Sequence, residues 1–123
     1  MHDLDHLLPL PHLSTLVLLA LAEGDAHGWA VIRRIRDITD GETSPSSGSL
    51  YIAMLRLEER GLIEETESPA EEGDVDARRR YYRMTTFGRR VLEAESRRLE
   101  RLVSEARRWK LLDRSTRPAR GGA

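Results

Sequence analysis

Apolar side chains recur along this chain at helical spacing in several separate stretches. Leucines and a valine are concentrated between Pro11 and Gly24. This predicts a first helix over residues 11–22 that is buried on most sides. In residues 25–41 a valine and three isoleucines fall on one face, and charged residues fall on the other. This second pattern predicts an amphipathic helix with Asp25 as its N-cap and Gly41 at its end.

Residues 46–61 carry the clearest amphipathic pattern. Apolar residues stand at positions i, i+3, i+4 and i+7, namely Leu50, Ala53, Met54 and Leu57. A serine, Ser46 or Ser47, is the expected N-cap, and Gly61 is expected to end the helix. The pattern predicts a third helix whose core face is centred on Leu50, Met54 and Leu57.

The next segments predict a hairpin followed by a long helix. Residues 62–67 and 79–84 are rich in strand-forming side chains, and the polar, acidic residues 68–77 between them predict a long loop. Thr85 can cap a final helix over 86–112. Residues 1–10 are expected to form an N-terminal arm, and residues 113–123, with their proline and glycines, a disordered tail.

This order of elements predicts a mainly α fold with a small β-hairpin. Three helices and a hairpin over residues 11–85 have the layout of a winged helix-turn-helix domain, a fold that binds DNA. The helix over 86–112 would then be a C-terminal dimerisation helix. The third helix is the candidate for reading the DNA sequence.

The face of the third helix opposite its core face carries Ile52 and Leu55, with Ser49, Tyr51 and Arg56 on the flanks. Hydroxyls near the helix start, on Ser47 and Ser49, could bond phosphates or base edges, and aliphatic groups could meet thymine methyls. The alternative is that Ile52 and Leu55 pack under the hairpin or a neighbouring helix. The pattern alone favours neither.

The amino-acid composition excludes several classes of protein. The 123 residues are 39 % apolar and 33 % charged, which suits one small domain. The longest apolar run, residues 16–22, is far shorter than the roughly 20 residues needed to cross a bilayer, and the acidic start does not resemble a secretory signal. We therefore expect a cytoplasmic location and no membrane partner. Without cysteine the chain has no disulfide, thiol nucleophile or cysteine-bound zinc.

The formal net charge of −1 hides a strong separation of charge along the chain. Residues 62–76 hold seven acidic side chains and no basic one, whereas residues 77–110 hold twelve basic and four acidic ones. Binding of a polyanion responds to the local patch rather than to the sum. The candidate DNA-binding residues are therefore Ser47, Ser49, Tyr51, Ile52 and Arg56 of the third helix, and Arg78, Arg79 and Arg80 of the basic block.

No constellation of catalytic residues is found. His2 and His6 stand four apart but have no third ligand in view, and the serines lack the spacing of a nucleophile elbow. The carboxylates of the wing, the hairpin formed by residues 62–84, have no apolar surroundings to raise a pKa for acid–base work. We expect no enzyme activity, no metal and no cofactor; Trp29 is expected to pack within the fold.

The apolar residues of the final helix predict that two copies of the chain assemble. Its apolar stripe continues beyond the length needed to cover its own domain, through Leu99, Leu102, Val103, Ala106 and Trp109. An exposed stripe of that length would be unusual on a monomer, so a second copy of the chain is its simplest cover. Trp109 could also line a pocket for a small-molecule effector at that interface.

Three segments resemble the PadR family of transcriptional regulators. They are His27-Gly28-Trp29-Ala30-Val31, then Gly48-Ser49-Leu50-Tyr51 with the later run from Leu57 to Ile63, and finally the run from Arg78 to Thr85 with Gly88. Together they cover about residues 11–110 in the family's order. The single helix after the wing resembles the smaller members of the family.

The resemblance implies a homodimeric repressor or regulator that binds an inverted-repeat operator and is released by a ligand. It also implies that Tyr51 and Ser49 lie on the DNA, and that Arg79 and Arg80 reach phosphates or the minor groove. Two features depart from the family pattern: Leu55 replaces a residue that is often basic, and the wing tip at 71–76 carries four acids. The alternative function is a winged-helix module that binds a protein and no DNA.

Overall fold

The computed structural model describes residues 4–67 and 80–112. Its elements are a 3-10 helix η1 (Asp5–Leu7), helix α1 (His12–Ala22), strand β1 (Ala26–His27), helices α2 (Gly28–Ile38) and α3 (Ser47–Glu59), strands β2 (Ile63–Thr66) and β3 (Tyr81–Met84), and helix α4 (Thr86–Arg108). This order confirms the predicted mainly α, winged-helix fold. The expected tail, 113–123, lies outside the described residues.

Side-chain caps explain where three of the helices begin. The Ser46 hydroxyl accepts a hydrogen bond from the Ser49 amide at 3.1 Å, and the Thr85 hydroxyl accepts one from the Gly88 amide at 2.9 Å. For α2 the cap is His27, whose Nδ1 accepts the Ala30 amide at 3.3 Å. The prediction of Asp25 as this cap was wrong, because residues 26–27 are extended and pair with β3 before the helix starts.

The sheet has three antiparallel strands in the order β1-β3-β2, not the predicted two. β2 pairs with β3 so that Glu64 faces Arg83 and Glu65 faces Tyr82, and β1 adds Ala26 opposite Tyr82 on the other edge. A strand of two residues is too short to show an alternating pattern, which is why the sequence did not reveal β1.

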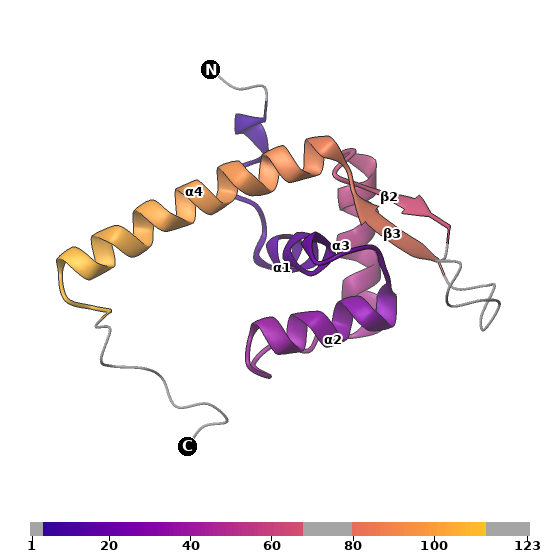
Figure 1. Cartoon of the computed structure of the whole chain (residues 1–123), viewed down its shortest axis with the longest axis horizontal. Coiled ribbons are helices and arrows are strands. Elements are labelled where there is room, and N and C mark those ends of the chain that lie inside the picture. Colours follow the sequence, from indigo (N-terminus) through magenta and orange to yellow (C-terminus); the bar gives the residue numbers. More distant parts are fainter. Residues whose placement is uncertain (1–3, 68–79, 113–123) are drawn as a thin grey trace.

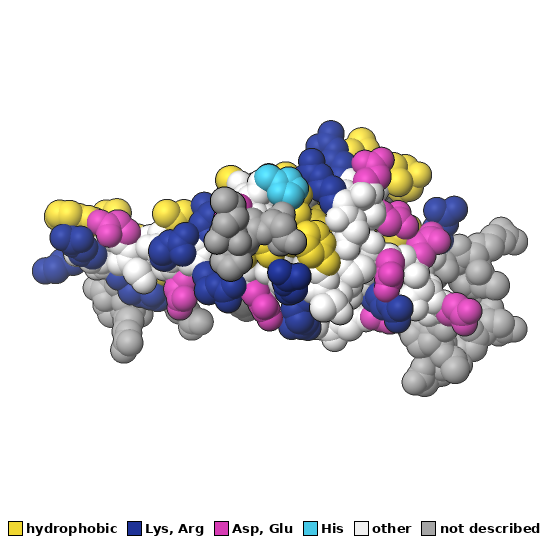
Figure 2. Space-filling view, turned by 90° about the horizontal axis from the view of Figure 1, so that it is seen from above, with side chains coloured by type: hydrophobic (Ala, Val, Ile, Leu, Met, Phe, Trp, Pro, Cys, Tyr) yellow, Lys and Arg dark blue, Asp and Glu magenta, His cyan; other side chains and the backbone are white. Residues whose placement is uncertain are grey.

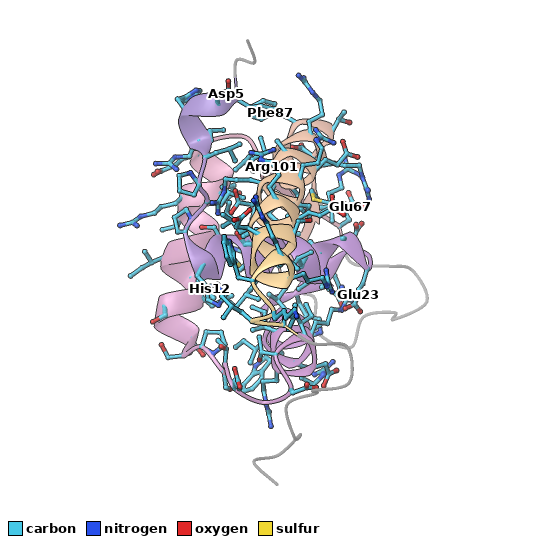
Figure 3. All side chains as sticks on the ribbon, turned by 90° about the vertical axis from the view of Figure 1, so that its left-hand side faces the viewer. Asp5, His12, Glu23, Glu67, Phe87 and Arg101 are labelled. Carbon is cyan, nitrogen blue, oxygen red and sulfur yellow. The ribbon has the colours of Figure 1, made fainter. Side chains whose placement is uncertain are left out.

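The core forms around α1, which lies between α2, α3 and α4 (Figure 1). Its side chains are buried along most of its length, as predicted. Leu4 and Leu10 also belong to this core, so the described part of the expected N-terminal arm packs against the domain. The Glu95 carboxylate of α4 accepts the Leu10 backbone amide and holds this segment in place. Figure 3 looks along α4, with the segment that bears Asp5 beside it.

Helix α4 projects past the rest of the fold (Figure 1) and ends at Arg108, four residues before the predicted Leu112. Lys110 adopts a left-handed conformation with φ 60°, and the amides of Lys110 and Leu111 return to the carbonyls of Arg107 and Ala106. This is a Schellman ending, and because it forms here without glycine, no residue type marked the end of the helix in advance. In the described part of the chain, no helix is long and apolar enough to span a membrane.

Candidate nucleic-acid interface

The first turns of α3 expose the residues that the helical wheel placed on its outer side. Leu50, Met54 and Leu57 are buried, which fixes the helix against the core. Tyr51 is 55 % exposed and Ile52 53 % exposed, and Ser47 and Ser49 are exposed as well. The alternative in which Ile52 and Leu55 pack under the hairpin or a neighbouring helix is wrong, since both side chains are exposed.

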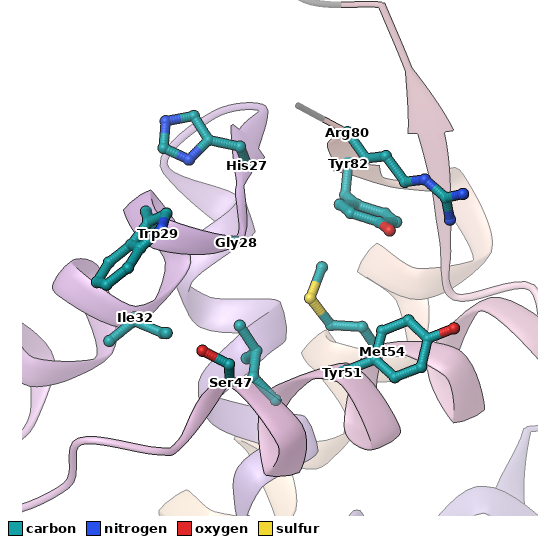
Figure 4. A pocket seen from close by; sticks show the side chains of 10 residues that line it. His27, Gly28, Trp29, Ile32, Ser47, Tyr51, Met54, Arg80 and Tyr82 are labelled. Atoms are coloured by element: carbon teal, nitrogen blue, oxygen red, sulfur yellow. The ribbon is translucent and has the colours of Figure 1, made fainter. Parts of the chain in front are cut away.

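A shallow groove of about 350 Å³ separates the start of α3 from the start of α2 and from β3 (Figure 4). Aromatic side chains stand on both sides of it: Trp29 on one, Tyr51 and Tyr82 on the other. The groove is lined by His27, Gly28, Trp29, Ile32, Ser47, Leu50, Tyr51, Met54, Arg80 and Tyr82. It thus brings together three predicted site residues: Ser47 and Tyr51, both on α3, and Arg80, which is distant from them in sequence.

Arg80 is the cation at the rim of this groove. Its Nε lies 3.3 Å from Oε2 of Glu65 on β2, and the guanidinium also donates a hydrogen bond to the Tyr82 hydroxyl oxygen. Tyr82 first, and Glu65 second, raise the pKa of Arg80, so the guanidinium keeps its charge. Burial raises the pKa of Tyr82, and the hydrogen bond with Arg80 opposes that effect. A permanent positive charge therefore stands beside the exposed start of α3.

The remaining predicted residues are less closely grouped. Arg56 is exposed farther along α3 and does not line the groove. Ser49 is exposed, and its hydroxyl accepts a hydrogen bond from Ser46 at 3.1 Å. Arg78 and Arg79 lie outside the described residues.

Trp29 is the residue that the sequence interpretation missed. It was expected to pack within the fold, but it is 64 % exposed and forms one wall of the groove. At about 100° per residue, Trp29 falls about 120° away from the core face of α2 formed by Val31, Ile32 and Ile35. A helical wheel of α2 would have revealed its exposure.

The predicted dimer stripe is exposed on the projecting half of α4. Leu99, Leu102, Val103 and Trp109 face solvent, and Ala106 is half-buried. Figure 2 shows apolar side chains along one edge of this end of the molecule, beside a surface of arginines and glutamates. The Trp109 indole donates to Glu105 at 2.7 Å, and the Arg108 guanidinium lies 5.4 Å from its ring centre.

Known proteins resemble this chain in sequence and in fold. An uncharacterized 37.1 kDa protein in a transposon of Streptomyces fradiae is 39 % identical over 87 residues, which are 71 % of this chain and 23 % of that protein. This chain therefore spans about a quarter of that relative's length. A transcriptional regulator from Clostridium thermocellum shares the fold with a TM-score of 0.66 and 27 % identity, covering 80 % of this chain and 90 % of the other.

A PadR-family transcription regulator from Clostridium difficile has the same fold, with a TM-score of 0.69 and 22 % identity over 80 % of this chain and 98 % of that one. The model of the transcriptional regulator PadR-like family matches residues 17–94, from the middle of α1 into α4. That span includes the groove, the predicted reading helix α3, and strands β2 and β3. The chain belongs to the PadR-like family of transcriptional regulators.

Proposed function

We propose that this chain is a transcriptional regulator that binds double-stranded DNA as a homodimer. The observation that carries the proposal is the continuous surface formed by the exposed start of α3 and the charged rim at Arg80. On this surface α3 would enter the major groove, and the wing would hold the phosphate backbone. Membership in a family of transcriptional regulators supports the same function.

The start of α3 has the chemistry for contacts to both backbone and bases. The hydroxyls of Ser47, Ser49 and Tyr51 can bond phosphates or base edges, and the Ile52 side chain can meet a thymine methyl group. None of these side chains is needed in the core, because all are exposed. They can therefore change partner without unfolding the helix.

The wing would contribute affinity that does not depend on sequence. Arg80 directly follows Arg78 and Arg79 in the chain, which makes this the most basic run of the sequence. Each phosphate that such residues neutralise releases counterions, so affinity falls as salt rises. We propose that Arg79 and Arg80, with Arg78 beside them, make these backbone contacts.

The exposed stripe on α4 supports the dimer. Pairing of two copies through Leu99, Leu102, Val103, Ala106 and Trp109 would place two α3 helices on one DNA molecule. For a two-fold dimer the operator would be an inverted repeat with half-sites about 34 Å apart, or a multiple of that distance. We further propose that the protein is a repressor released by a small molecule, with Trp109 lining the effector site at this interface.

Selection of duplexes from a random pool, followed by binding measurements at several salt concentrations, tests the DNA-binding function. We expect enrichment of an inverted repeat and a slope of log affinity against log salt of about −0.9 per neutralised phosphate. Arg80→Ala should flatten that slope by about one unit. Arg83→Ala is the matched control, because Arg83 lies on the other face of β3, paired with Glu64. If no duplex is enriched and none binds, the proposal is wrong.

A protein-binding module is the second candidate. The exposed aliphatic side chains of Ile52 and Leu55 favour it, since they form an apolar patch on α3. A protein bound through this patch should show little dependence on salt, and Arg80→Ala should leave its binding unchanged. The same salt series therefore distinguishes the two functions.

A further inference from the structure

The wing carries two cross-strand ion pairs, one on each face of the hairpin. Oε2 of Glu64 lies 2.8 Å from Nε of Arg83, and Oε2 of Glu65 lies 3.3 Å from Nε of Arg80. Neighbouring residues on a strand point to opposite faces, and residues two apart share one. Arg80 therefore shares a face with Tyr82, and both line the groove beside α3.

Only the Glu65 pair lies on the groove side. Glu65 is the register partner of Tyr82, whereas Glu64 is the register partner of Arg83 on the far face. Figure 4 shows Arg80 and Tyr82 on the same side of the groove as Tyr51. Among the described residues, Arg80 is the one arginine that lines the groove beside α3, and it is ion-paired with Glu65.

A carboxylate and a phosphate offer a guanidinium the same kind of acceptor, two oxygens that can take parallel N–H bonds. Glu65 lies at the Nε edge of the Arg80 guanidinium and offsets part of its charge, so a phosphate that binds this edge has to displace the carboxylate. The pair is open to solvent, with the Arg80 side chain 69 % exposed and that of Glu65 47 % exposed, so a phosphate could reach Arg80 and displace Glu65. Exchange at such an exposed pair costs little.

We propose that Glu65 competes with DNA phosphates for the Arg80 guanidinium and so weakens the binding of the wing to the DNA backbone. The inference rests on the proposed DNA-binding function and deepens it by naming the residue that sets affinity. Because Arg80 would contact phosphate rather than a base, Glu65 lowers affinity for operator and random duplexes by the same factor. The ratio between the two affinities stays unchanged, and every complex dissociates faster.

Glu65→Gln tests this role, with Glu64→Gln as the matched control. Both variants remove one negative charge from β2, but only the first removes the carboxylate that is paired with Arg80. Binding of labelled operator and random-sequence duplexes should tighten in Glu65→Gln by about two- to fivefold more than in Glu64→Gln, the range expected for one exposed ion pair. Equal melting temperatures would show that both variants fold.

A double-mutant cycle with Arg80→Ala isolates the pair. In the Arg80→Ala background, the extra gain from Glu65→Gln over Glu64→Gln should vanish. If the extra gain persists without Arg80, or if both glutamine variants tighten binding equally, Glu65 acts only through its charge and the competitor role is wrong. If wild-type protein binds no duplex at any salt concentration, the proposed function itself fails, and the inference with it.

Discussion

The aromatic side chains of α2, α3 and β3 fall into two kinds, buried and exposed. Tyr81 is buried and packs edge-to-face on His27, with ring centres 5.2 Å apart, and Tyr82 is buried as well. Tyr51 and Trp29 project from the same region but leave more than half of their surface in solvent. Loss of an exposed aromatic group costs binding rather than folding, because it leaves no cavity behind.

Tyr51→Ala should therefore weaken DNA binding while leaving the melting temperature nearly unchanged. Leu57→Ala on the same helix is the contrasting variant, since Leu57 is 2 % exposed and its truncation should cost about 2–5 kcal/mol of unfolding free energy. Thermal denaturation and duplex binding of the two variants check this. A Tyr51→Ala protein that melts as early as Leu57→Ala would place the tyrosine in the core.

Gly88 allows α4 to start close to the end of α3. A Cβ at this position would collide with the carbonyl oxygen of Leu62, and the Leu62 carbonyl also accepts the Thr85 amide at 3.1 Å. Neither the backbone carbonyl nor the capped helix start can move aside freely, because each holds the other.

Gly88→Ala should destabilise the protein by about 1–3 kcal/mol, the usual cost of forcing an added methyl group into a packed site. Gly48→Ala is the matched control, because a Cβ there meets nothing within 4 Å. That variant should be as stable as wild type or more stable by up to about 1 kcal/mol, from helix propensity. Chemical denaturation measures both, and equal effects of the two substitutions would contradict the packing argument.

At the scale of elements, Glu95 joins α4 to the N-terminal segment. Its carboxylate is buried, receives two 2.8 Å hydrogen bonds from Arg98, and also accepts the Leu10 amide. The Arg98 guanidinium lowers the pKa of Glu95 despite the opposing effect of burial. A carboxylate with a lowered pKa stabilises the fold while it is ionised.

Glu95→Gln should lower the unfolding free energy at neutral pH by about 1–3 kcal/mol, as expected for a buried bond to a charged group. The sign of the pH dependence follows from the lowered pKa: the stabilisation is complete above the unfolded value of about 4.3 and is lost as pH falls through the folded one. The difference between wild type and variant should therefore shrink below about pH 4. Denaturation curves across pH measure it.

Glu105→Gln provides the control on the same helix. Glu105 pairs with Arg108 at 3.9 Å in an exposed position, so its loss should cost under about 1 kcal/mol. A Glu95→Gln variant no less stable than Glu105→Gln would show that the tie to Leu10 and Arg98 contributes nothing.

For the whole molecule, the projecting half of α4 is the feature that its own domain leaves uncovered. The helix is about 35 Å long at 1.5 Å per residue. Its first half packs through Val91 and Leu92, whereas in its second half Leu102 is 57 % exposed. Apolar surface in a continuous stripe usually marks an interface.

Leu102→Asp combined with Ala106→Asp should convert the proposed dimer into a monomer, because two carboxylates would face a dry interface. Operator affinity should fall far more than helix content. Ser104→Asp is the control, since Ser104 lies on the opposite, polar side of α4. Light scattering at micromolar concentration and circular dichroism make the comparison, and a monomeric wild-type protein would refute the assembly.

The periodicity of apolar residues predicted all four long helices and the core face of α3, because these depend on neighbours within two turns of the chain. Residue types predicted the cap at Thr85 and a serine cap at Ser46 or Ser47, of which the structure uses Ser46, because caps are local hydrogen bonds. Neither predicted β1 or the His27 cap, since both follow from pairing with a strand more than fifty residues away. Likewise Leu4 and Leu10 join a core that no local pattern around them indicates.

In the candidate site, too, the sequence predicted some features, and only the fold determined the others. Exposure of Tyr51 and Ile52 follows from helix geometry once the core face is known, so the sequence was sufficient for them. The groove beside Trp29 and the pairing of Arg80 with Glu65 required the fold, because strand register decides which charges face α3 and which face away. Sequence patterns carry information over one helix or strand, whereas contacts between distant segments are settled only when those segments pack together.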